Sequence, residues 1–158
     1  MRILGIDPGY SIIGWAVIES NLELVSFGTV QPPSYLALND KLVTIHDEMK
    51  ELIQRYTPDC AAIEKIYFSR NTKTAMDVAK CIGVISLTIK MANIEIQEYN
   101  PTQIKHTITG YGKADKNQIQ KMITKIYNIN TIPEPDDAAD AIAIATCHSL
   151  NMNLSLNK

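Results

Sequence analysis

The chain has 158 residues, of which 46% are hydrophobic and 20% charged, and these values describe one globular domain rather than a disordered protein. No apolar run approaches the ~18 residues that span a bilayer, so a membrane protein is not expected. The net charge is -2, yet residues 64–125 hold ten Lys/Arg against five Asp/Glu, a local charge of +5. Such a stretch fits a nucleic-acid-binding surface or an ordinary solvated one. Three cysteines without close pairing indicate reduced thiols and a cytoplasmic protein.

The first part of the chain predicts three strands, a helix and a fourth strand. Pro8-Gly9 is a turn signal after the first apolar run, and Ser20-Asn21 joins the next two runs tightly enough for an antiparallel hairpin. Asp40 is expected to cap the helix. We expect strands at residues 2–7, 12–19 and 22–30, a helix at residues 40–56, and a short buried strand at residues 60–64.

The second part predicts four helices and one more strand. Asn100-Pro101 is typical of a helix N-cap followed by proline at the first helical position. We expect helices at residues 72–91, from Pro101, at residues 115–127 and from Asp136 to about Leu150, with a strand at residues 94–99. This order predicts an α/β fold with one mixed sheet and helices on its faces. Residues 1–150 form the single domain, and residues 151–158 a short C-terminal tail.

Two acidic residues follow predicted buried strands directly. Asp7 ends the first strand, and Glu64 ends the strand that begins at Cys60. Ligands of α/β proteins bind near the carboxyl ends of strands, so both carboxylates are candidate active-site groups. Taken singly, Asp7 is equally typical of a turn, whereas Glu64 is more typical of a surface position than of an active site.

A third acidic cluster lies on the last predicted helix. Asp137 and Asp140 stand three residues apart and share one face, and Asp140 lies at the rim of the buried side. Asp136 and Asp137 also fit the acidic first turn of a helix, but this explanation does not extend to Asp140. Acids on one face repel each other unless a cation lies between them.

Four such carboxylates form a suitable set of ligands for Mg²⁺, which prefers oxygen donors and is completed by water and substrate phosphate. Two ions roughly 3.5–4 Å apart stabilise both the attacking and the leaving oxygen of a phosphodiester. Without a cation, the acids would repel a nucleic-acid backbone. The sequence therefore predicts a metal-dependent nuclease with Asp7, Glu64, Asp137 and Asp140 at its centre.

Five motifs, in this order and spacing over essentially the whole chain, resemble one known family. They are Gly5-Ile-Asp-Pro-Gly9 followed by Gly14, Ala62-Ile-Glu-Lys-Ile-Tyr-Phe-Ser-Arg-Asn71, Tyr99-Asn-Pro-Thr-Gln-Ile-Lys105, Gly110-Tyr-Gly-Lys-Ala-Asp-Lys-Asn-Gln118 and Asp137-Ala-Ala-Asp-Ala-Ile-Ala-Ile-Ala145. The sequence resembles the RuvC family of Holliday-junction resolvases, which are dimeric bacterial endonucleases. The resemblance implies a ribonuclease H-like fold with a five-stranded mixed sheet flanked by helices.

The resemblance also implies a role for each matching residue. The four acids would hold two Mg²⁺ ions, or Mn²⁺ in their place, while Lys105 and Lys116 contact DNA near the scissile phosphate and assist the reaction. Without the resemblance, ordinary solvated side chains are the better explanation of both lysines. Tyr67 would stack on bases at the junction centre, with Phe68 beside it. The remaining DNA contacts are expected at Arg70, Asn71 and Lys113.

The implied reaction is in-line hydrolysis that leaves a 5′-phosphate on each nicked strand. A homodimer formed through the helix at residues 72–91 would nick two strands symmetrically, and a branch-migration motor complex is an expected partner. Two alternatives remain: a ribonuclease H-like nuclease that processes structured RNA, and a junction-binding module without metal. The presence of all four acids disfavours the second. The roles of His106 and Asp136 are not assigned by these patterns.

Overall fold

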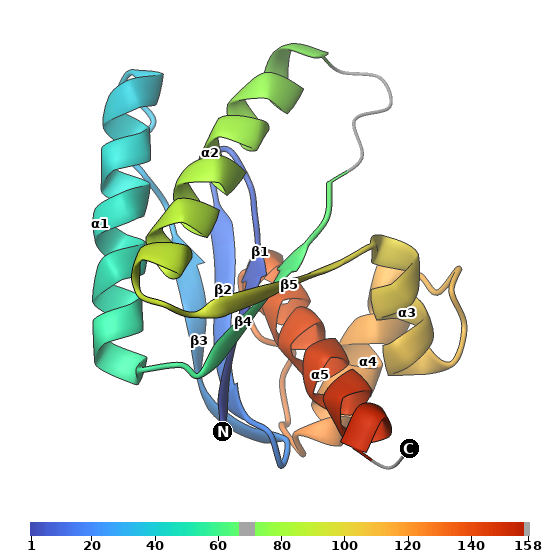
Figure 1. Ribbon diagram of the computed structural model, residues 1–158. Helices are drawn as coiled ribbons and strands as arrows, with labels where there is room; N and C mark the ends of the chain where they lie inside the picture. Colours follow the sequence, from blue (N-terminus) through green and yellow to red (C-terminus); the bar gives the residue numbers. More distant parts are fainter. Residues whose placement is uncertain (67–71, 157–158) are drawn as a thin grey trace.

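The computed structural model describes residues 1–66 and 72–156, and the side chains of all these except residues 72–73 and 153–156. Within that part of the chain, five strands form one sheet in the order β3-β2-β1-β4-β5 (Figure 1). The strands are β1 (Arg2–Asp7), β2 (Ile13–Glu19), β3 (Glu23–Val30), β4 (Cys60–Glu64) and β5 (Glu95–Tyr99). β1, β2 and β3 pair antiparallel, whereas β4 pairs parallel with β1 and with β5. The predicted mixed sheet of five strands is confirmed.

Helices cover both faces of this sheet (Figure 1). The described residues form α1 (Leu38–Tyr56), α2 (Thr72–Met91), α3 (Pro101–Thr109), α4 (Lys116–Ile126) and α5 (Asp136–Leu156). One face packs against α1 and α2, and the other against α3, α4 and α5. None of these helices combines the length and apolar character needed to cross a membrane.

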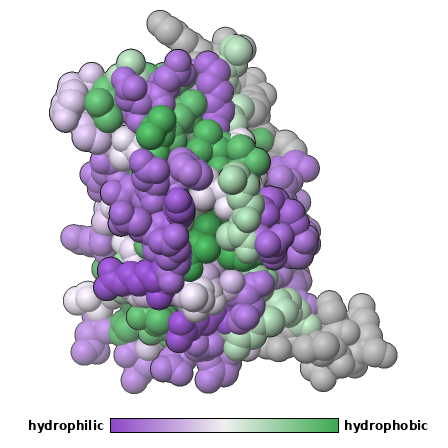
Figure 2. Space-filling model, turned by 60° about the vertical axis from the view of Figure 1, so that its left-hand side comes forward, coloured by the Kyte–Doolittle hydropathy of each residue, from purple (hydrophilic) through white to green (hydrophobic). Residues whose placement is uncertain are grey.

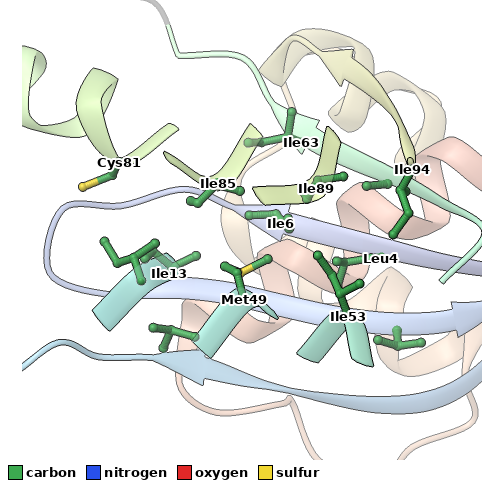
Figure 3. Close-up of a cluster of buried hydrophobic side chains, with 14 residues drawn as sticks. Leu4, Ile6, Ile13, Met49, Ile53, Ile63, Cys81, Ile85, Ile89 and Ile94 are labelled. Atoms are coloured by element: carbon green, nitrogen blue, oxygen red, sulfur yellow. The ribbon is translucent and has the colours of Figure 1, made fainter. Parts of the chain in front are cut away.

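A first core lies between the sheet and the pair α1 and α2. Figure 3 shows Met49 of α1 and Ile85 of α2 meeting Leu4 and Ile6 of β1, and all four side chains are buried. Burial of each aliphatic side chain of this size contributes about 1.5–3 kcal/mol. These contacts with two helices fix the position of β1, and with it the position of its C-terminal end.

The second core is built around α5, whose alanines are small enough to bring its backbone close to the sheet. Ala138, Ala141 and Ala145 are all buried. A Cβ atom at Gly5 would lie 2.3 Å from the carbonyl oxygen of Ala141, and one at Gly14 would lie 1.9 Å from that of Asp137. Only glycine at these two strand positions permits so close an approach.

Two predicted boundaries were wrong by two residues or more, whereas the other predicted bounds agree within one residue. α1 begins at Leu38 with Ala37 as its N-cap, and Asp40 lies in the first turn, where its charge is favoured by the helix dipole. α5 continues past Leu150 to Leu156, so most of the predicted tail, residues 151–158, extends the helix. No glycine or proline follows Leu150 to end it.

Candidate active site

The two strand acids lie at the same end of the sheet because β1 and β4 are parallel neighbours. Ile6 pairs with Ile63, which places the following residues, Asp7 and Glu64, side by side. The two carboxyl groups act on each other electrostatically, since the charge of Glu64 raises the pKa of Asp7.

The helix acids reach the same place because α5 packs on two glycines. Gly14 pairs with Asp7 across the antiparallel ladder, and the carbonyl group of Asp137 occupies the space that a Gly14 side chain would fill. The first turn of α5 therefore lies beside Asp7. Asp140 follows less than one turn later and acts electrostatically on both Asp7 and Glu64. The structure thus brings all four predicted acids together.

Burial and mutual repulsion control the protonation of this cluster. Burial, followed by the charges of Glu64, Asp140 and Asp137, raises the pKa of Asp7 to about 7 against the partial opposition of Lys116. Burial also raises the pKa of Glu64, aided by Asp140. The same cause raises the pKa of Asp140, although Lys116 acts in the opposite direction. A site that holds protons so far above the ordinary carboxyl range is one that favours positive charge.

The donor set fits a hard divalent cation. Its carboxylate oxygens are the ligands that Mg²⁺ and Mn²⁺ prefer, and no histidine or cysteine lies among the four acids. Among the described residues, no three acidic, histidine or cysteine side chains are arranged in this structure so that they could hold a metal ion by themselves. Mg²⁺ does not require such an arrangement, since it usually keeps several waters and takes only one or two carboxylates, with substrate phosphate completing its shell. The metal role of the four acids stays a prediction.

Both predicted lysines lie beside the acids. The charge of Lys105 on α3 partly opposes the rise in the pKa of Glu64 that burial causes, and Lys116 Nζ lies 3.1 Å from Asp140 Oδ2. Lys116, Glu64 and Asp140 line a pocket of about 260 Å³ together with Lys105 and apolar side chains such as Ile104. The carboxylates of this pocket would repel a phosphate. The two lysine ammonium groups can therefore bind one only when cations neutralise the negative charge of the acids.

Two capped helices fix the backbone from which these lysines project. The Asn100 side chain accepts a hydrogen bond from the Gln103 backbone N–H at 2.8 Å, and the Gln103 side chain accepts one from the Asn100 backbone N–H at 3.0 Å. Asp115 and Gln118 form the same reciprocal arrangement at the start of α4. Lys116 is the first residue of α4, directly after its cap. These capping boxes satisfy the free N–H groups and hold both helix N-termini in place.

Several predicted residues lie elsewhere. Tyr67, Phe68, Arg70 and Asn71 fall outside the described residues. Lys113 is exposed in the loop between α3 and α4, away from the residues that line the pocket.

His106 is separate from the acids. It lines a larger groove of about 700 Å³ on α3.

Sequence reasoning missed the link between α4 and Asp136. Lys116 Nζ lies 3.1 Å from Asp136 Oδ2 as well as from Asp140. Gln120 donates a hydrogen bond to Asp136 Oδ1 at 3.1 Å. The contacts join α4 to α5 across the fold, and the only local signal was an additional acid before Asp137.

Comparison with known proteins agrees with this geometry. The family model described as crossover junction endodeoxyribonuclease RuvC matches residues 3–148. The protein of that name from Halothermothrix orenii is 43% identical, with 98% of this chain and 96% of the relative covered. That from Caldicellulosiruptor saccharolyticus is 44% identical, with 96% and 93% covered.

Solved structures give the same answer. The structure of Thermus thermophilus RuvC superposes with a TM-score of 0.91 at 26% identity, covering 98% of this chain and 97% of that one. RuvC from the same organism in complex with a Holliday junction substrate also gives 0.91, at 27% identity over 98% of this chain and 96% of that one. The fold is the ribonuclease H-like fold that the sequence motifs implied. The chain belongs to the RuvC family.

Proposed function

We propose that this protein is an endonuclease that resolves four-way DNA junctions by metal-dependent nicking of two strands. The observation that carries the proposal is the meeting of Asp7, Glu64, Asp137 and Asp140 beside two lysines at one end of the sheet. Relatives that match nearly the whole chain are named crossover junction endodeoxyribonucleases, and a similar structure holds a Holliday junction substrate. Both names describe the same substrate class.

Asp7, Glu64, Asp137 and Asp140 would hold two Mg²⁺ ions, with Mn²⁺ as an alternative. When bound, these ions would neutralise the acids and supply Lewis-acid chemistry to the phosphodiester. Lys105 and Lys116 approach the same pocket and would balance negative charge on the scissile phosphate. Ile104 and Ile144 contribute apolar side chains to the lining of the same pocket. In-line hydrolysis would leave a 5′-phosphate and a 3′-hydroxyl.

The decisive assay compares a synthetic four-way junction, a linear duplex and a structured RNA, each with and without Mg²⁺. We expect paired nicks in the junction alone, and only with the cation present. Asp7→Asn and Glu64→Gln should each reduce cleavage by at least about 10³-fold, because each removes a charged ligand at the reacting centre.

Junction binding separates loss of chemistry from loss of recognition. Both variants should still shift the junction in a gel, since the DNA-contacting residues are unchanged. Cleavage of the RNA with an intact junction would favour the RNA-processing alternative. Binding without cleavage under any divalent cation would favour a junction-binding module.

A second copy of this chain is the partner that the α2 surface fits. Met76, Leu87 and Met91 have exposed fractions of 66%, 61% and 69%, and Gly83 lies between them. These positions follow helical spacing and form one exposed stripe. Figure 2 shows hydrophobic surface among the polar groups on the side of the molecule where α1 comes forward.

Gly83 strengthens this proposal. A Cβ atom there would meet nothing within 4 Å, so the packing of this chain does not require glycine. A glycine in a helix interior costs about 0.5–1 kcal/mol relative to alanine, and close approach of a second helix would offset that cost. A two-fold dimer through α2 would carry two equivalent active sites, which suits a junction with two strands of like polarity.

The remaining DNA contacts are assigned to Tyr67, Phe68, Arg70, Asn71 and Lys113. Lys113 is exposed, as a phosphate-contacting lysine must be. Lys113→Ala should weaken junction binding and reduce the slope of log K against log salt by about one. A branch-migration motor complex remains the partner expected from the family.

A further inference from the structure

The ammonium group of Lys116 is shared between two carboxylates with different surroundings. Its Nζ atom lies 3.1 Å from Asp140 Oδ2 and 3.1 Å from Asp136 Oδ2. Asp140 is one of the four clustered acids, whereas the side chain of Asp136 is 62% exposed at the start of α5. One partner of the lysine therefore belongs to the proposed metal site, and the other stands outside it.

Asp136 is itself held in position from α4. Gln120 donates from Nε2 to Asp136 Oδ1 at 3.1 Å, and only 6% of Gln120 is exposed. Lys116 and Gln120 stand four residues apart on α4, so they project on one face. The two oxygens of Asp136 thus have separate partners, the buried Gln120 and the half-exposed Lys116. An exposed ion pair by itself fixes a lysine side chain only weakly. Because the buried amide of Gln120 fixes the orientation of the Asp136 carboxylate, that carboxylate also fixes the direction in which Lys116 points.

Cation binding changes the balance between these two partners. A divalent cation on Asp140 would use the oxygens that Lys116 contacts, and would repel its ammonium group. Lys116 has a long, flexible stem and its side chain is 47% exposed, so without another partner it would move into solvent. Asp136 lies on the same helix as Asp140, one turn earlier, and remains available.

We infer that Asp136, anchored by Gln120, is a positioning residue that keeps the Lys116 ammonium group beside the active site when a cation occupies Asp140. The inference rests on the proposed function, in which Lys116 acts on the scissile phosphate. Asp136 touches neither substrate nor the reacting atoms, and it acts through Lys116 alone.

The first test observes the lysine directly, without DNA. In ¹H–¹⁵N spectra of lysine ammonium groups, the Lys116 signal is identified by its loss in Lys116→Arg and followed during Mg²⁺ titration. We expect it to persist at saturating Mg²⁺ in the wild type and to disappear in Asp136→Asn. Gln120→Leu should weaken it. Persistence in Asp136→Asn, or loss from the wild type as Mg²⁺ binds, would overturn the inference.

This titration also separates the inference from the proposed function. If calorimetry on the same sample detects no Mg²⁺ binding, both the metal-dependent function and the inference fail. If Mg²⁺ binds and Asp136→Asn retains the Lys116 signal, only the inference fails.

The second test is a double-mutant cycle in single-turnover junction cleavage with excess enzyme. Asp136→Asn should lower the rate about tenfold while junction affinity stays within about twofold, because only the placement of one assisting group is lost. Asp136→Glu should restore most of the rate. In a Lys116→Met background, Asp136→Asn should have no further effect. An equal fall in both backgrounds would contradict the inference.

A matched control removes an exposed carboxylate elsewhere. Glu95 pairs with Lys90 and lies at the end of β5 opposite Tyr99, which neighbours Glu64 in the sheet. Glu95→Gln removes one surface ion pair and one negative charge, as Asp136→Asn does. It should leave both the Lys116 signal and the cleavage rate unchanged.

Discussion

Asp7 takes up a proton when the chain folds. Its pKa rises from an ordinary value of 3.8 to about 7, through burial first and then through the charges of Glu64, Asp140 and Asp137. Between about pH 4 and 7 the folded state therefore binds more protons at Asp7 than the unfolded state does. Stability without metal falls as pH rises through this range, and above pH 7 the full cost remains.

Asp7→Asn should therefore stabilise the metal-free protein at pH 8. We expect the free energy of unfolding to increase by about 2–4 kcal/mol, because asparagine keeps the shape and removes a buried charge. At pH 4 the gain should vanish. Urea unfolding in EDTA at both pH values measures the difference, with exposed Glu51→Gln on α1 as the control. A variant that is less stable than the wild type at pH 8 would refute this explanation.

At this scale the sequence predicted some acids better than others. Asp137 and Asp140 follow from helical spacing, because that spacing alone puts two carboxylates on one face. Asp7 and Glu64 depended on surrounding motifs, since a single acid after a strand has several explanations. The contact of Asp136 with Gln120 could not be predicted from the sequence, because it joins two helices that meet only in the folded chain.

The next scale is that of α5 and the strands beneath it. Gly5 and Gly14 leave room for the backbone of α5, and the register of β1 with β2 places Gly14 opposite Asp7. The close packing of α5 on the sheet therefore depends on the absence of side chains at Gly5 and Gly14 rather than on contacts between bulky side chains. Any group added at Gly14 pushes against the carbonyl of Asp137, a residue of the candidate site.

Gly14→Ala should damage both stability and the site. Its Cβ would lie 1.9 Å from Asp137 O, so α5 must shift, and we expect a loss of about 2–4 kcal/mol in the free energy of unfolding. Weaker Mg²⁺ binding should accompany it. Urea unfolding and Mg²⁺ titration calorimetry measure the two effects. Unchanged stability would show that the helix packs less directly than described.

Element boundaries were predicted well where local chemistry decides them. The cap at Asn100 is confirmed because a capping box is local in sequence, and Asp115, predicted as the first residue of the next helix, is its N-cap. The start of α1 was wrong because Asp40 suits a first turn as well as a cap. The length of α5 was underestimated because nothing in the sequence after Leu150 marks an end, and continued packing is a tertiary effect.

For the whole molecule, the exposed stripe on α2 carries the prediction of a dimer. Leu87→Glu should dissociate the dimer without unfolding the chain, because 61% of Leu87 is exposed. Sedimentation equilibrium should show a dimer for the wild type and a monomer for the variant. Ile132→Glu, at an exposed position between α4 and α5, is the control and should remain dimeric. A dimeric Leu87→Glu would move the interface away from α2.

The overall architecture was predictable because it follows from element order. Three sequential strands and then alternating helices and strands allow few arrangements other than a mixed sheet covered on both faces. The assignment of helices to faces was less accessible. It depends on which apolar surface each helix presents, and α5 is apolar on almost every side, with its residues from Ala141 to Ser149 all buried.

The order in which the acids occur along the chain has a consequence during synthesis. Asp7 belongs to the first strand and Asp137 and Asp140 to the last helix, so a ribosome completes the strand acids long before the helix acids. A nascent or truncated chain that ends before residue 136 carries only half of the carboxylates. If the four acids act together as proposed, nuclease activity would arise only once α5 has been made and has docked on Gly5 and Gly14.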